Sequence, residues 1–177
     1  MDLFRAAERL MAMDDRAWAR HASDASVYTR IASSVPWFLA LWSVHWIGGW
    51  AVVPLGLMAA WTVANPRLFA APARADGWAQ RGVLGERAFL NRAIVPIPVA
   101  FVRAGWITTA VAIVFLAVTI WGLVIGDIAL AATGWAGALV AKLWFVDRMA
   151  WLWGEMKDRH PVYAAWARAD WRARLEV

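Results

Sequence analysis

Residues 104–126 read AGWITTAVAIVFLAVTIWGLVIG, and these 23 residues contain no Asp, Glu, Lys or Arg. A helix needs about 20 apolar residues to cross the ~30 Å hydrocarbon core of a bilayer, so this stretch by itself predicts a membrane-spanning helix. A short turn at Gly126-Asp127 leads into residues 128–146, which we expect to return as an antiparallel neighbour. Small residues in the returning segment, among them Gly134 and Gly137, would let the two helices approach closely.

A second uncharged block covers residues 31–66. Adjacent glycines, Gly48 and Gly49, interrupt it near its centre and are flanked by Trp46 and Trp50. Glycine pairs favour turns, and Trp is enriched at membrane interfaces, so the block predicts a hairpin whose tip lies at an interface. Each arm of this hairpin is short for a complete crossing, which leaves a re-entrant pair as the alternative.

The overall composition agrees with a membrane protein. The chain has 177 residues, of which 62% are hydrophobic and 18% are charged, whereas a soluble domain has about 45–50% apolar and about 25% charged residues. A soluble domain of this size could not bury so much apolar side chain. There is no Cys, which excludes disulfides and thiolate metal sites. We predict an all-α integral membrane protein with one domain, 1–177, and four transmembrane helices in two hairpins, 31–66 and 104–146.

The polar segments 1–30, 67–103 and 147–177 are expected to form short amphipathic helices on one side of the membrane. All Lys and Arg residues except Lys142 lie at or beside these segments, and neither hairpin tip has any. Basic residues stay on the cytoplasmic side, so both termini should be cytoplasmic and the protein should lie in the inner membrane of a bacterial cell. The net charge of +5 then indicates attraction to anionic headgroups. No nucleic-acid motif accompanies it.

One candidate site combines polar residues at the cytoplasmic interface. A charge inside a membrane span is a functional hypothesis by default, and Lys142 is such a charge. The alternative is a Lys side chain that snorkels to the interface or pairs with Asp147. Glu86 is equally open to interpretation as a surface ion pair. The residues expected in this polar cluster are Arg67, Glu86, Arg87, Asn91, Lys142, Asp147 and Arg148.

A second candidate site is aromatic. Most of the 15 Trp residues fall near the two interfaces, but Trp42 and Trp135 are expected nearer mid-membrane, where an indole N–H needs a partner. Together with His45 they would suit a flat ligand such as a porphyrin or quinone, although no cofactor is predicted outright. The alternative is an interfacial His beside a Trp belt. The three His residues lack the mutual spacing of a metal site, so no metal is predicted.

Several strings in the chain resemble a family of small prokaryotic membrane proteins of unknown function. They are WARH (Trp18–His21), YTR (Tyr28–Arg30), NPRLF (Asn65–Phe69), RGVLGER (Arg81–Arg87), LNR (Leu90–Arg92) and KLWFVDRMAWL (Lys142–Leu152). The resemblance implies no activity. Because the strings fall on the expected cytoplasmic side, we predict a non-enzymatic docking or structural subunit, which would bind a membrane protein or a second copy. The alternative is a protein that binds, or an enzyme that acts on, a lipid, quinone or porphyrin.

Overall fold

The computed structural model describes residues 14–173, and every element in that part of the chain is helical, which confirms the all-α prediction. The elements are α2 (Asp15–His21), α3 (Asp24–Ala32), α4 (Ser34–Trp42), α5 (Val44–Ile47), η1 (Gly48–Ala51), α6 (Val52–Leu68), α7 (Trp78–Leu90), α8 (Val99–Ile125), α9 (Ile128–Met156) and α10 (Pro161–Ala167). The first half of the expected N-terminal helices, residues 1–13, lies outside the described residues.

Three helical stretches in residues 14–173 are long and apolar enough to cross a membrane. They are Asp24–Leu68 with 45 residues, Val99–Ile125 with 27 and Ile128–Met156 with 29. At 1.5 Å per residue, α8 and α9 are each about 40 Å long, which exceeds the hydrocarbon core. Helix α9 continues ten residues beyond the end expected at Val146, so the C-terminal polar segment begins inside a continuous helix.

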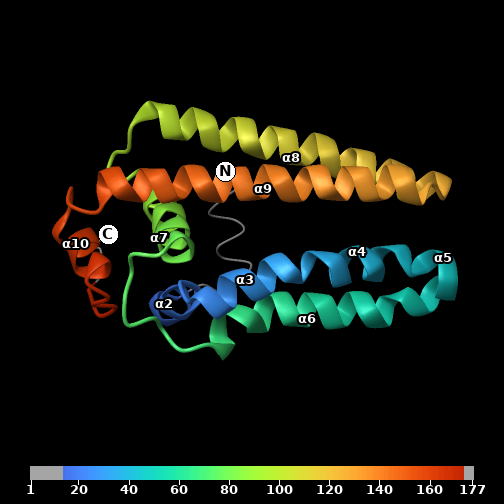
Figure 1. Cartoon of the computed structure of the whole chain (residues 1–177), viewed down its shortest axis with the longest axis horizontal. Coiled ribbons are helices and arrows are strands. Elements are labelled where there is room, and N and C mark those ends of the chain that lie inside the picture. The colour runs from blue at the N-terminus through green and yellow to red at the C-terminus, as the bar shows by residue number, and fades with distance from the viewer. Residues whose placement is uncertain (1–13, 174–177) are drawn as a thin grey trace.

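Helices α8 and α9 lie side by side and antiparallel (Figure 1); we call this pair the second arm. Small residues permit the contact, because a Cβ on Gly134 would lie 2.5 Å from the backbone nitrogen of Thr119. Gly126 closes the turn between the helices with φ +72°, a conformation that favours glycine. The Asp127 carboxylate then caps α9 by accepting from the Leu130 N–H at 3.0 Å.

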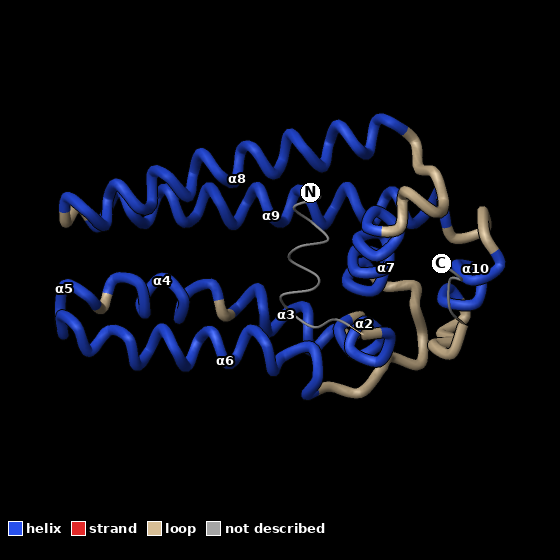
Figure 2. Tube along the Cα trace, turned by 180° about the vertical axis from the view of Figure 1, so that it is seen from behind, coloured by secondary structure: helices blue, strands red, loops and turns tan. Residues whose placement is uncertain are grey.

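Helices α3 to α6 form the first arm, in which the chain runs out through α5 and returns through α6 (Figure 2). Gly48 makes the reversal with φ +54°. Trp37 Nε1 donates to Thr62 Oγ1 across 3.1 Å and joins α4 to α6. The outgoing helix is broken between α3 and α4 because Pro36 has no N–H to offer the carbonyl of Ala32.

Helix α7 crosses the end of the molecule opposite the two turns and separates two clusters of buried side chains (Figure 1). Leu84 and Phe89 pack with α9 and α10, whereas Val83 packs with α2 and α3. The contact with α9 is so close that a Cβ on Gly85 would lie 1.8 Å from the carbonyl oxygen of Met149. The structure therefore buries α7 between the other helices, although its sequence predicted a helix on the membrane surface.

Candidate ligand-binding site

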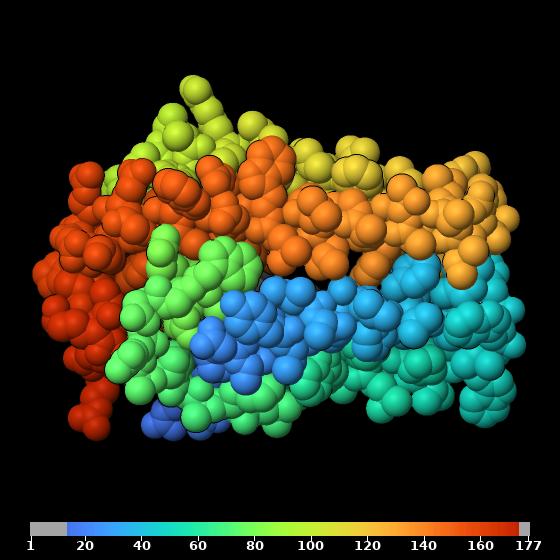
Figure 3. Space-filling view, in the orientation of Figure 1, coloured from blue at the N-terminus to red at the C-terminus, as the bar shows by residue number. Residues whose placement is uncertain are grey.

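A cavity of about 560 Å³ lies between the two arms, at the end where α7 crosses. Residues of α2, α3, α7, α8 and α9 line it, so it exists only because the arms stand apart there. In the space-filling view, a narrow gap runs between α9 and the first arm (Figure 3). The volume falls within the roughly 300–1,000 Å³ that is typical of small-molecule sites.

The walls of the cavity that belong to the second arm are mostly apolar. Ala112, Ile113 and Leu116 come from α8, and Leu139 and Leu143 come from α9. These residues lie in the parts of α8 and α9 that are candidate membrane spans. These walls can therefore accommodate a hydrocarbon group, and the residues named here carry no charge that could bind a polar one.

One end of the cavity is polar, and an ion pair between α7 and α9 lies there. Lys142 Nζ lies 3.2 Å from Glu86 Oε1, so the partner of Lys142 comes from another helix and is not Asp147 of its own helix. Burial by itself raises the pKa of the Glu86 carboxyl. The ammonium of Lys142, its hydrogen bond and the neighbouring cations outweigh that effect and lower the pKa below its ordinary value. Glu86 is therefore an ionised carboxylate at neutral pH.

A chain of oriented hydrogen bonds connects the polar end of the cavity to α6. Arg30 Nη1 faces His21 Nε2 at 3.5 Å, and a guanidinium can only donate, so Nε2 accepts. His21 Nδ1 therefore carries the proton and donates to Ser26 Oγ at 3.1 Å. Ser26 Oγ donates to Asn65 Oδ1 at 2.8 Å, and Asn65 Nδ2 donates to Thr29 Oγ1 at 2.9 Å. Burial, followed by the charge of Arg30, lowers the pKa of His21 to about 3, so the imidazole is neutral.

A family described as "Family of unknown function (DUF6653)" matches residues 5–170. The chain belongs to this family. The matched range includes every residue that lines the cavity. No curated protein and no solved structure matches the chain. The match agrees with one part of the resemblance seen in the sequence, that the family is of unknown function. Because the family has no assigned activity, the functional argument rests on the geometry of the site.

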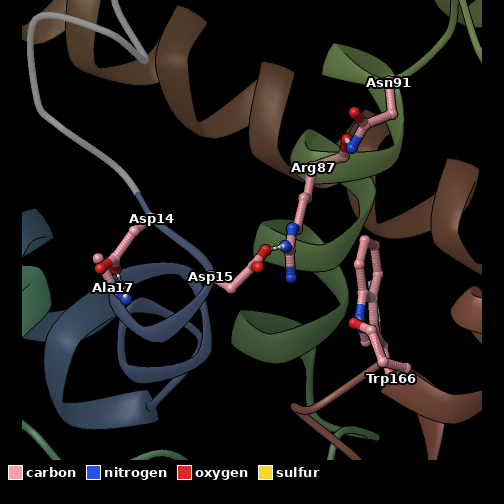
Figure 4. A network of polar contacts seen from close by, with 7 residues as sticks. Asp14, Asp15, Ala17, Arg87, Asn91 and Trp166 are labelled. Carbon is pink, nitrogen blue, oxygen red and sulfur yellow. Dashed lines mark hydrogen bonds and ion pairs between the residues drawn. The ribbon is translucent and has the colours of Figure 1, made fainter. Parts of the chain in front are cut away.

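The seven residues predicted to form one polar cluster lie in separate places. Only Glu86 and Lys142 meet at the cavity. Arg87 points away from it, donates to the carboxylate of Asp15, and stacks with its guanidinium carbon 3.9 Å from the ring centroid of Trp166 (Figure 4). Arg87 thus holds α2 and α10 against α7. Its side chain is buried, which removes it from any docking surface.

The remaining four predicted residues make mostly local contacts, although Asp147 also accepts from Trp78 Nε1 of α7 at 3.4 Å and the carbonyl of Arg67 accepts from Arg20 Nη1 of α2 at 2.9 Å. Asn91 Nδ2 donates to the carbonyl of Arg87 at 2.9 Å at the end of α7. Asp147 pairs with its neighbour Arg148 at 2.6 Å. Arg67 lies at the end of α6 in the first arm, and its guanidinium donates to a carbonyl of its own helix. None of these four residues lines the cavity.

The residues of the predicted aromatic site link the two arms outside the cavity. Trp135 Nε1 donates to the carbonyl of Ser34 at 2.9 Å, which supplies the partner that its indole needs. His45 Nε2 donates to the carbonyl of Leu123 at 3.0 Å, and its ring lies 4.3 Å from that of Trp42. None of the three lines the cavity. Their contacts are with other parts of this protein, and a porphyrin or quinone at this site stays a hypothesis.

Sequence reasoning missed two residues at the polar end, His21 and Arg30. Both lie in strings that the family resemblance quoted, WARH and YTR, and their hydrogen-bond partner Asn65 begins the string NPRLF. These strings were the signal from which His21 and Arg30 could have been selected. The sequence does not show, however, that the three strings lie together in the fold. Within residues 14–173, no three His, Asp or Glu side chains converge as metal ligands would.

Proposed function

We propose that this protein is an inner-membrane protein with four transmembrane segments in two hairpins, and that it binds a small amphipathic ligand in the cavity between them. The single observation that carries the proposal is the cavity itself, which combines apolar walls on α8 and α9 with a charged end formed by Arg30, Glu86 and Lys142. The hydrocarbon part of such a ligand would contact the apolar walls, and its polar head would contact the charged end.

The lengths and contacts of the arms support four crossings. Helices α8 and α9 are each long enough to span the bilayer. His45, near the tip of the first arm, bonds to Leu123, which lies three residues before the turn at Gly126. The two tips therefore lie close together, which supports the proposal that the first arm crosses the membrane together with α8. This contact favours complete crossings over a re-entrant pair.

The distribution of charge supports the proposed orientation. The described polar helices α2, α7 and α10 lie at one end, and the two turns, which contain no Lys or Arg, lie at the other end (Figure 1). Most of the basic residues in 14–173 therefore belong to one end, and the positive-inside rule supports a cytoplasmic location for that end. The termini would then be cytoplasmic, beside the anionic headgroups that the basic residues attract.

Ligand binding is preferred over the docking hypothesis because of where the polar residues lie. Docking required seven polar residues to share one surface. Instead, Arg87 is buried against Asp15 and Trp166, and Glu86 faces the cavity with Lys142. The seven residues therefore do not form one surface that a partner could contact.

The test is to purify the protein in a mild detergent and identify stoichiometrically bound molecules by native mass spectrometry and by extraction. Ala112→Trp would fill the cavity from α8, and Ala110→Trp is the matched control, because Ala110 is exposed and does not line it. We expect a ligand in the wild type and in A110W that is absent from A112W. Equal occupancy of both variants, or no bound molecule in any of them, would overturn the proposal.

A further inference from the structure

The charges at the polar end of the cavity do not balance. Among the described residues that line it, Arg30 and Lys142 are cations and Glu86 is the only carboxylate. Glu86 is engaged with Lys142 at 3.2 Å. No carboxylate in residues 14–173 lies within ion-pair distance of Arg30, whose hydrogen-bond partner in that range is His21 at 3.5 Å.

His21 cannot supply the missing negative charge. Its Nδ1 proton is committed to Ser26 Oγ, which in turn donates to Asn65, and both of these side chains are fully buried. The imidazole is therefore held as a neutral acceptor that orients the guanidinium of Arg30 without neutralising it. Among residues 14–173, one excess positive charge remains at the end of a largely apolar cavity.

An excess charge in such surroundings is costly unless a counter-charge is bound. A guanidinium presents two parallel N–H donors, which match the oxygens of a carboxylate or a phosphate. A neutral quinone or alcohol would offer one acceptor and no charge. Lys142 is less suited to this role, because it already has Glu86 and lies over the ring of Phe145 at 4.7 Å.

We infer that the ligand is a hydrocarbon chain with an anionic head, a carboxylate or a phosphate monoester, and that Arg30 binds the head. The inference rests on the proposed ligand-binding function and specifies its substrate class. The head lies between α3 and α7, at the polar end, and the chain extends along Ile113, Leu116 and Leu143 toward the middle of the second arm.

The experiment compares three probes with one conjugated polyene chain: the fatty acid, its methyl ester, and the phosphate monoester of the corresponding alcohol. The full chain is reconstituted in nanodiscs of phosphatidylcholine, and energy transfer from Trp to the polyene reports binding. Acid and ester partition differently into lipid, so the deciding quantity is each probe's affinity in Arg30→Gln relative to the wild type. Arg103→Gln is the control, because Arg103 is exposed at the start of α8 and does not line the cavity.

We expect Arg30→Gln to weaken binding of the fatty acid or the phosphate at least about tenfold, as the loss of a hydrogen bond to a charged group does. Ester binding should be unchanged in R30Q, which also shows that this variant is folded, and R103Q should bind all probes like the wild type. Arg30→Lys keeps the charge and should retain part of the preference for the anion. Whichever anionic probe loses more affinity identifies the head.

Two results would overturn the inference: equal loss of acid, phosphate and ester binding in R30Q, or no loss of any. If all probes bind alike but Ala112→Trp abolishes binding, the cavity still binds amphipathic molecules and only the anionic head is wrong. If no probe binds the wild type, or if A112W and A110W bind the probes equally, the proposed function itself fails.

Discussion

The imidazole of His45 donates a hydrogen bond to the carbonyl of Leu123 across 3.0 Å. The bond joins the tip of one arm to the last turn of α8 in the other, 78 residues away in the chain. At the opposite end, α7 lies between the arms. The arms are thus held at both ends, and the cavity lies between them next to α7.

Because the tips of the two arms lie together, we predict that both are on the same side of the membrane. Because the chain has no Cys, single cysteines can be introduced at the tips as Gly49→Cys and Ile125→Cys, with Arg81→Cys on α7 as the control. A membrane-impermeant maleimide should label the two tip variants in cells with a permeabilised outer membrane and should label R81C only after lysis of the inner membrane. Labelling of G49C only after lysis would show that the first arm does not cross.

The close contact of α7 with α9 predicts a strong effect of one methyl group. Gly85→Ala would place its Cβ 1.8 Å from the carbonyl oxygen of Met149, so α7 must move. We expect the free energy of unfolding to fall by about 1–3 kcal/mol or more. Gly154→Ala is the matched control: its Cβ would meet nothing within 4 Å, and it should stabilise α9 by up to about 1 kcal/mol. Denaturant titration followed by Trp fluorescence measures both, and similar values for the two variants would contradict this packing.

The Glu86–Lys142 pair predicts a pH-dependent stability. The folded state lowers the pKa of Glu86, so the ionised carboxylate stabilises the fold at neutral pH. This contribution is complete above the ordinary Glu pKa of about 4.3 and is lost as the pH falls through the lower folded-state pKa. Since the Lys142 side chain is 57% exposed, we expect Glu86→Gln to cost only about 1 kcal/mol at pH 7.

Thermal unfolding in detergent over a range of pH checks this expectation. The difference in Tm between the wild type and E86Q should shrink as the pH falls below about 4.3. Glu155→Gln, at an exposed position of α9, should show little difference at any pH. A difference in Tm between the wild type and E86Q that stayed constant over the whole pH range would disprove the role of the ionised carboxylate.

The hydrogen-bond chain from His21 predicts that a single buried hydroxyl is important. Ser26→Ala removes the group that accepts from His21 and donates to Asn65, which leaves two buried polar atoms without a partner. Such a loss costs about 1–3 kcal/mol of unfolding free energy. Thr133→Ala removes an exposed hydroxyl bonded only to its own helix and should change stability little. If a denaturant titration gave equal losses of unfolding free energy for the two substitutions, the hydrogen bonds from His21 through Ser26 to Asn65 would be contradicted.

Much of the fold could be predicted from the sequence because the deciding signals are local. The length of an uncharged apolar segment decides whether it can cross a bilayer. Residues 104–126 meet this criterion whatever the rest of the chain contains. The glycine turns are local too: Gly48 and Gly126 both adopt the positive φ that a tight reversal needs.

The candidate site was only partly predictable because its members are distant in sequence. Glu86 and Lys142 are 56 residues apart, and His21 reaches Asn65 only through Ser26. Glu86 and Arg87 were assigned to one cluster because both were expected at the cytoplasmic interface. On a helix, however, consecutive side chains point about 100° apart.

The sequence by itself determined the apolar segments, the turns that join them and the uneven distribution of charge along the chain, since each of these depends on short stretches. Only the tertiary structure decided which charges meet. Because α7 is inserted between the two arms, it turns Glu86 toward the cavity and Arg87 toward Asp15 and Trp166. The same insertion leaves Arg30 facing the cavity beside a neutral histidine. The partner of a buried charge is set by the packing around it, and that packing joins parts of the chain that no local pattern connects.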